Sequence, residues 1–146
     1  MKSYIFDANS ISLEFADRIP EKWSRCWKEI KIYRTKELLL IEPLISETYY
    51  KNIPKHGKKV CKDKILWLKS LQNVKIHQID DNDAIAAGDI KNTYFTNKLS
   101  LVDCFVLAIA KKYSATLFTT DSSMRDIARK LNINVDFLPL PEGNES

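Results

Sequence analysis

The sequence contains very little glycine and histidine. Only three glycines occur in 146 residues, at Gly57, Gly88 and Gly143. They lie too far apart to form a GxGxxG turn or a Walker A loop, the two glycine-rich segments that hold nucleotide phosphates. The two histidines, His56 and His77, form no recognisable nucleophile–base pattern. Nucleotide binding through these motifs is therefore excluded, and the sequence gives no support to histidine-based hydrolysis.

Cysteine is also scarce, and long apolar runs are absent. Cys26, Cys61 and Cys104 are far apart, form no CxxC pair and are odd in number, which argues against a zinc ribbon and a disulfide scaffold. Unpaired cysteines are typical of reducing compartments, so we expect a cytoplasmic protein. We expect no signal peptide, because Asp7 interrupts the only early apolar stretch. No apolar run approaches the roughly 18 residues of a membrane span.

The remaining composition is that of an ordinary globular chain. Its length fits one domain, which we expect to cover residues 1–140, with residues 141–146 as a frayed tail. The formal net charge is +4, from 23 basic and 19 acidic residues. This mild excess suits an acidic partner such as RNA, but many proteins without a nucleic-acid role carry as much.

Short apolar runs alternate with segments of helical periodicity. Such alternation predicts an α/β fold with a central parallel sheet covered by helices on both faces. The predicted strands are Ser3–Phe6, Leu38–Ile41, Ala115–Phe118 and Val135–Leu138, with Val74–Ile79 as a strand or an extended connection. Two helices are predicted around Trp23–Ile30 and Ile65–Leu68, and three more over Asp83–Phe95, Ser100–Tyr113 and Ser122–Leu131. A further helix is predicted to begin at Pro43 and to be interrupted by Pro54 and Gly57. The helix Ser100–Tyr113 is almost entirely apolar and is therefore expected to be central and buried.

Four acidic residues are placed where such a fold binds ligands. Asp7 ends the first strand and Asp121 ends the strand ATLFTT. Ligands of open parallel sheets bind beyond the carboxyl ends of the strands, so both side chains should enter one crevice. Glu47 and Asp103 lie early in helices that follow or flank these strands. We therefore expect all four carboxylates to converge.

Each acid also has a purely structural interpretation. Asp7 and Asp121 precede helices and can cap them. Asp103 forms an S-x-x-D capping-box pattern with Ser100, and Glu47 can be a solvated acid near a helix N-terminus. Four converging acids, however, repel one another and raise their pKa values unless a cation neutralises them. Mg²⁺ or Mn²⁺ with oxygen ligands meets that need and supports phosphodiester hydrolysis.

Four segments together resemble a known family. The segments YIFDANSI, PLISETYY, LSLVDCFVLAIAKKY and TLFTTDSSM are similar, in this order, to the four signature blocks of PIN-domain proteins, and especially of VapC-type toxin ribonucleases. The resemblance spans about Tyr4 to Leu138. It implies a three-layer α/β/α fold, a divalent-metal site and an endoribonuclease that cleaves single-stranded RNA. It also implies an antitoxin partner and a homodimer.

The resemblance assigns roles to individual residues. Asp7, Glu47, Asp103 and Asp121 match the acidic quartet of the family. Asn9 matches the small polar residue two positions after the first acid, and Thr119 and Thr120 match the hydroxyl residues before the last acid. In the mechanism that this implies, the three aspartates hold metal directly, and Glu47 binds a second metal or orients water. Asn9 and Thr119 support them through hydrogen bonds.

Three other features allow two interpretations each. The basic stretch is either a solvated face or a surface that guides RNA phosphates, and it contains Lys51, Lys55, His56, Lys58, Lys59, Lys62 and Lys64. The candidate RNA contacts among these residues are Lys55, Lys58, Lys59 and Lys62. The helix with Trp23 and Trp27 has no counterpart in the family signature, so it either covers the sheet or contacts a partner. The acids Asp80, Asp81, Asp83 and Asp89 lack the EF-hand pattern, and Asn82 or Asp83 is the expected cap of the next helix.

Two other functions compete with the ribonuclease hypothesis. A PIN domain that has lost catalysis would bind RNA or protein without cutting it, but the intact quartet argues against this. A receiver-type regulatory domain would need an acidic pair beside a strand-end aspartate and a lysine after a later strand. We find no convincing set of this kind.

Overall fold

The computed structural model describes residues 2–140. Its centre is a five-stranded sheet with the order β3-β2-β1-β4-β5, in which all neighbouring strands are parallel. The strands are β1 (Lys2–Phe6), β2 (Lys36–Leu40), β3 (Val74–Ile76), β4 (Thr116–Thr119) and β5 (Val135–Phe137). The predicted parallel sheet is confirmed. The predicted tail, residues 141–146, lies outside the described residues.

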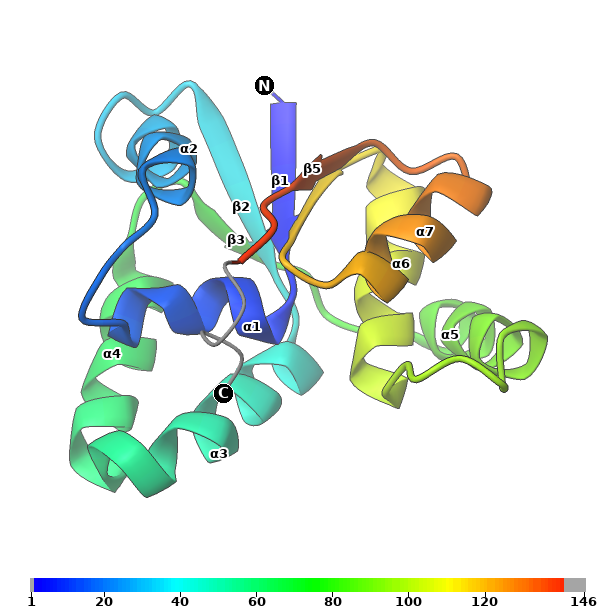
Figure 1. Cartoon of the computed structure of the whole chain (residues 1–146), viewed down its shortest axis with the longest axis horizontal. Helices are drawn as coiled ribbons and strands as arrows, with labels where there is room; N and C mark the ends of the chain where they lie inside the picture. Colours follow the sequence, from blue (N-terminus) through cyan, green and yellow to red (C-terminus); the bar gives the residue numbers. More distant parts are fainter. Residues whose placement is uncertain (1, 141–146) are drawn as a thin grey trace.

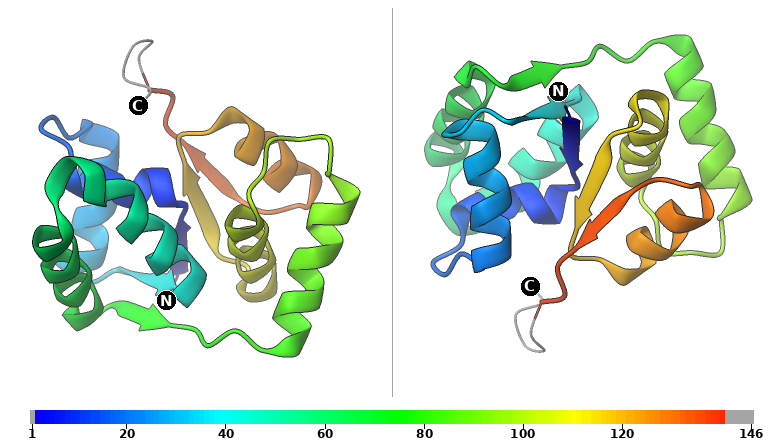
Figure 2. Two further views of the ribbon diagram at one scale, coloured as in Figure 1. Left: turned by 90° about the horizontal axis from the view of Figure 1, so that it is seen from below. Right: turned by 90° about the horizontal axis from the view of Figure 1, so that it is seen from above.

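Helices cover both faces of the sheet, as predicted (Figure 1). The first face carries the helices between β1 and β3, and the second carries α5 to α7, with α5 packed on α6 (Figure 2). The helices are α1 (Ala8–Ile11), followed by a 3-10 turn (Ser12–Phe15), α2 (Glu21–Lys31), α3 (Glu42–His56), α4 (Lys58–Ser70), α5 (Asp81–Thr93), α6 (Leu101–Tyr113) and α7 (Ser122–Lys130). No helix within residues 2–140 is long and apolar enough to cross a membrane.

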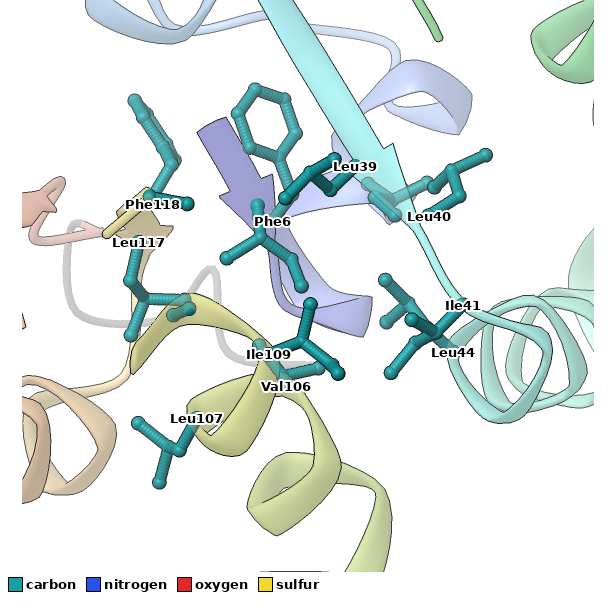
Figure 3. Packing of buried hydrophobic residues seen from close by; sticks show 14 of the residues in the cluster. Phe6, Leu39, Leu40, Ile41, Leu44, Val106, Leu107, Ile109, Leu117 and Phe118 are labelled. Carbon is teal, nitrogen blue, oxygen red and sulfur yellow. The ribbon is translucent and has the colours of Figure 1, made fainter. Parts of the chain in front are cut away.

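Helix α6 forms the centre of the second layer. Val106, Leu107 and Ile109 are fully buried and belong to the same apolar core as Leu117 of β4 (Figure 3). Burying a large apolar side chain stabilises the fold by about 1.5–3 kcal/mol relative to leaving it in water. The predicted central, buried helix is confirmed.

The two tryptophans of α2 belong to the core of the first layer. Trp23 and Trp27 are only 2% and 3% exposed and stack on each other with ring centroids 5.6 Å apart. Trp27 also contacts Phe6, and the Trp23 indole Nε1 donates to the Ser10 carbonyl oxygen at 2.8 Å. Their structural role is therefore confirmed, and these side chains are not available to a partner.

Two details of the predicted helices are wrong. Helix α3 continues through Pro54 and ends only at Gly57, whose φ of 82° breaks the helix. Proline in the last turn removes a single backbone donor, so the helix tolerates it there. The cap of α5 is Asp80 rather than Asn82 or Asp83. The Asp80 side chain accepts from the Asp83 amide, and the Asp83 side chain accepts from the Asp80 amide.

Candidate active site

Three of the four predicted acids are held at the starts of helices. Asp7 directly follows β1 and caps α1, with Oδ1 accepting from the Ser10 amide at 2.9 Å. Asp121 follows β4 and caps α7, with Oδ1 accepting from the Ser123 amide at 2.7 Å. Asp103 Oδ2 accepts from the Ser100 amide at 3.1 Å in the capping box of α6. The three capping interpretations are confirmed, and each cap engages one oxygen of its carboxylate.

Glu47 is the exception, because the structure contradicts its interpretation as a solvated acid. It lies in α3, on a helix packed against α1 and α6, and is only 6% exposed. Its Oε1 lies 3.4 Å from Lys51 Nζ. Its Oε2 is buried and has no hydrogen-bond partner within residues 2–140. Because leaving a buried acceptor without a partner is costly, this oxygen is suited to receive a cation or a donor.

The four carboxylates line one open cleft. Asp7 and Asp121 enter it from the carboxyl ends of β1 and β4, Glu47 from α3, and Asp103 from the start of α6. The cleft has a volume of about 230 Å³, and its walls also include Ala8, Asn9, Lys51, Lys98 and Ser100. The structure thus brings together four acids that are separated by up to 114 residues in the sequence. Within residues 2–140, however, no three acidic, histidine or cysteine side chains stand ready to hold one metal ion.

The predicted supporting residues are divided between the cleft and its surroundings. Thr119 is fully buried, and its hydroxyl donates to Asp7 Oδ2 and accepts from the Asp121 amide at 3.0 Å. It therefore links the ends of β1 and β4. Asn9 is exposed and lines the cleft. Thr120 is half-buried, follows the end of β4 and lies outside the cleft lining.

The site is electrostatically unfavourable without a cation. Burial raises the pKa of Asp7, the hydrogen bonds from Thr119 and Ser10 lower it, and the charge of Asp121 raises it again. The pKa of Asp103 is raised to about 6. Burial contributes most to this increase, the hydrogen bond from Ser100 opposes it, and the charges of Asp7 and Glu47 add to it. Desolvation and mutual repulsion therefore both favour the protonated acids.

The four candidate RNA lysines do not line the cleft, whereas Lys98 and Lys51, the first lysine of the same basic stretch, do. The exposed predicted residues are Lys55, Lys58, Lys59 and Lys62. The cleft instead contains Lys51 and Lys98. The sequence held a signal for Lys51, which follows Glu47 by four residues and so shares its helix face. For Lys98 the only signal was its position two residues before the capping box that begins at Ser100.

A family model for the PIN domain matches residues 4–130. The chain belongs to the PIN domain family. The match includes Asp7, Glu47, Asp103 and Asp121, and the order of the elements agrees with the predicted three-layer fold. No curated protein matches the sequence.

Solved structures share the fold of this PIN domain at low sequence identity. VapC20 from Mycobacterium tuberculosis, described as a sarcin–ricin loop cleaving toxin, superposes with a TM-score of 0.70 at 11% identity, over 84% of this chain and 93% of that chain. VapBC2 from Rickettsia felis, bound to a promoter DNA fragment, gives 0.70 at 13% identity, over 93% and 98% of the two chains. FitAcB from Neisseria gonorrhoeae gives 0.66 at 19% identity, over 93% and 97%. At these identities the likeness shows the fold alone.

Proposed function

We propose that this PIN domain is a Mg²⁺- or Mn²⁺-dependent endoribonuclease that cleaves single-stranded RNA. The observation that carries the proposal is the convergence of Asp7, Glu47, Asp103 and Asp121 on one cleft at the carboxyl end of a parallel sheet. The buried, unpartnered Oε2 of Glu47 and the raised pKa values of Asp7 and Asp103 support it. Both features fit residues that bind a cation.

The donor set fits a hard divalent ion, because every candidate ligand is a carboxylate oxygen. Asp7, Asp103 and Asp121 would hold the ion, and Glu47 would bind a second ion or orient the attacking water. The bound ion supplies an activated water and stabilises charge on the phosphate. Because no three acidic, histidine or cysteine side chains of the described residues are grouped to hold one ion, the carboxylates would have to turn toward it. The relief of their repulsion favours that movement.

Other residues of the chain hold the carboxylates in place. The Thr119 hydroxyl fixes the orientation of Asp7, and the Ser100 amide fixes that of Asp103. The amides of Ser10 and Ser123 hold Asp7 and Asp121 at the starts of α1 and α7, where helix dipoles favour negative charge. In this mechanism the exposed amide of Asn9 hydrogen-bonds to the substrate or to the water.

The proposal is tested by incubating the protein with a mixed pool of single-stranded RNA. We expect cleavage in Mg²⁺ or Mn²⁺ and none in an excess of chelator. Addition of the ion after chelation should restore the activity. Equal cleavage with and without chelator would contradict a metal-dependent mechanism.

A PIN domain that binds RNA or protein without cutting is the alternative. One observation favours it: Asp7, Asp103 and Asp121 cap helices and so have a structural function without any metal. The two functions differ in the same assay, since an inactive domain would bind the RNA pool and leave it intact at every metal concentration.

We further propose that the protein is the toxin of a toxin–antitoxin pair, acts in the cytoplasm and forms a homodimer. The likeness to VapBC2 and FitAcB structures is consistent with an antitoxin partner, and three buried, free cysteines are consistent with a reducing compartment. We also propose that residues 1–140 form a single domain. Light scattering at tens of micromolar tests the dimer. Co-purification with, and inhibition by, the product of an adjacent small gene tests the antitoxin.

The exposed lysines beyond the cleft are proposed as outer RNA contacts. If Lys55, Lys58, Lys59 and Lys62 guide RNA, replacing all four by glutamine should weaken binding of every sequence alike and flatten its salt dependence. An unchanged affinity and salt slope would leave these residues as a solvated face.

A further inference from the structure

Two lysines reach the acidic cleft from different elements. Lys51 lies on α3, one turn after Glu47, and Lys98 lies in the connection between α5 and α6, just before Ser100 and Asp103. Lys51 thus shares its part of the cleft lining with Glu47, and Lys98 shares its part with Asp103. A phosphodiester that lies over the carboxylates therefore meets an ammonium group from each side.

The two lysines differ in what they contact. Lys51 Nζ lies 3.4 Å from Glu47 Oε1, so this ammonium already neutralises a carboxylate that is only 6% exposed. Within residues 2–140, Lys98 forms no ion pair and its side chain is exposed. The backbone beside Lys98 is nevertheless anchored, because the next residue, Leu99, is buried and the Leu99 carbonyl oxygen accepts from Lys91 Nζ.

A metal ion and Lys51 compete for the same carboxylate. Four carboxylates and two ammonium groups leave the cleft with an excess of two formal negative charges, which one divalent ion neutralises. An ion held by Glu47, which is the second ion of the proposed function, would repel the Lys51 ammonium and so favour its departure from Oε1. The Lys51 ammonium would then be available beside the site to pair with the negatively charged phosphate of the substrate.

We propose that Lys51 and Lys98 form a two-lysine grip on the RNA backbone, in which Lys98 binds phosphate at all times and Lys51 only after a metal ion has taken Glu47. The inference rests on the proposed function, because it assumes a metal site and an RNA substrate. It gives the protein a defined order of assembly. RNA is held loosely by Lys98 before metal binds and tightly by both lysines afterwards.

The first test measures RNA binding by fluorescence anisotropy of a short single-stranded probe, in chelator and in Ca²⁺, with a gel to verify that the probe stays intact. Lys98→Gln should weaken binding about 5- to 10-fold in both conditions and reduce the salt slope by about 0.7. Lys51→Gln should do the same in Ca²⁺ but leave binding in chelator unchanged. Lys75→Gln, an exposed lysine on the edge strand β3, is the matched control. Equal losses for Lys51→Gln in both conditions would overturn the proposed order.

The second test measures Mn²⁺ binding by calorimetry without RNA. Removing the ammonium that competes for Glu47 should make Lys51→Gln bind Mn²⁺ several-fold more tightly than Lys98→Gln and the wild type do. Unchanged or weaker Mn²⁺ binding by Lys51→Gln would contradict the competition. If the wild-type protein neither binds Mn²⁺ nor cleaves RNA, the proposed function fails together with the grip. If it does both and the lysine variants match Lys75→Gln, the grip alone fails.

Discussion

At the scale of single residues, the aspartates of the cleft serve two purposes at once. Asp7, Asp103 and Asp121 each accept a backbone N–H at the start of a helix. The helix termini thereby stabilise charges that otherwise repel one another. Capping and metal binding are consequently compatible, because the two oxygens of an ionised carboxylate together offer about four lone-pair sites. Asparagine keeps the capping oxygen and removes the charge, which makes it the informative substitution at these positions.

Metal-induced stabilisation should depend on Asp7. An ion that binds only the folded protein at 100 times its Kd adds about 2.7 kcal/mol, which raises Tm by roughly 5–10 °C for a domain of this size. Asp7→Asn should lose most of this gain while its Tm in chelator stays equal or rises, because one buried charge is gone. Differential scanning fluorimetry with and without Mn²⁺ measures both values. Identical metal-induced shifts in the variant and the wild type would place the ion elsewhere.

The pH dependence of stability should report Asp103. Its pKa is raised to about 6 in the folded protein, compared with about 3.9 in an unfolded chain. Between these values the folded state holds the extra proton, so stability falls as pH rises from about 4 to about 6 and stays reduced above. Asp103→Asn should therefore be more stable than wild type by about 1–2 kcal/mol at pH 7 in chelator, once partial exposure is allowed for. Urea unfolding at pH 4 should show no such advantage, and an equal difference at both pH values would contradict the assignment.

At the scale of helices and strands, local patterns predicted most of the fold. The strands at Ser3–Phe6 and Ala115–Phe118 and the buried helix from Ser100 were readable because apolar runs and caps are local signals. The path of α3 through Pro54 was not, since tolerance of a proline depends on its position in the last turn. The burial of Glu47 was missed for a related reason: it results from the packing of α3 against α1 and α6, which lie far away in the sequence.

The junction of α5 and α6 is held by Asp83, and its removal should destabilise the fold. Asp83 is 4% exposed, and its carboxylate contacts His77 Nε2 at 2.7 Å and Lys112 Nζ at 3.0 Å. Burial raises the pKa of Asp83, but the bonds from His77, the Asp80 amide and Lys112 outweigh it and hold the pKa below its ordinary value. Asp83→Ala should cost about 2–3 kcal/mol at pH 7.

The cost of Asp83→Ala should also depend on pH. A carboxyl whose pKa is lowered by folding stabilises the protein above about pH 4, and this contribution is lost as pH falls toward the folded value. The gap between Asp83→Ala and wild type should therefore narrow in acid. Asp89→Ala, an exposed acid on the same helix, is the control. Equal unfolding midpoints for the two variants at pH 7 would contradict the role of Asp83.

At the scale of the whole molecule, the topology determines where the acids meet. Strands β1 and β4 are neighbours in the sheet, where Tyr4 pairs with Thr116, although these residues lie far apart in the sequence. Their carboxyl ends therefore lie together. Residues of α3 and α6 also line the cleft, and these two helices belong to the two helical layers (Figure 2). The sequence indicated that the acids converge, but not this adjacency, nor that Lys51 and Lys98 share the cleft. Such contacts depend on how distant segments pack.

The charge distribution of the molecule fits an RNA substrate. The chain carries a formal net charge of +4, while the cleft holds four carboxylates against two lysines. A net positive charge attracts polyanions, and the excess of carboxylates in the cleft weakens phosphate binding there until a cation has bound. Metal binding is then a condition for productive contact, which is the central claim of the ribonuclease proposal.

The most direct measurement compares RNA cleavage by Asp103→Asn, by the wild type and by the matched surface variant Asp89→Asn in Mn²⁺. The substitution at Asp103 keeps the oxygen that accepts from Ser100 and removes the charge that a metal needs. We predict that its cleavage rate falls by orders of magnitude while circular dichroism shows an intact fold, and that Asp89→Asn cleaves like the wild type. If Asp103→Asn cleaves RNA as fast as the wild type, the four-carboxylate mechanism is wrong.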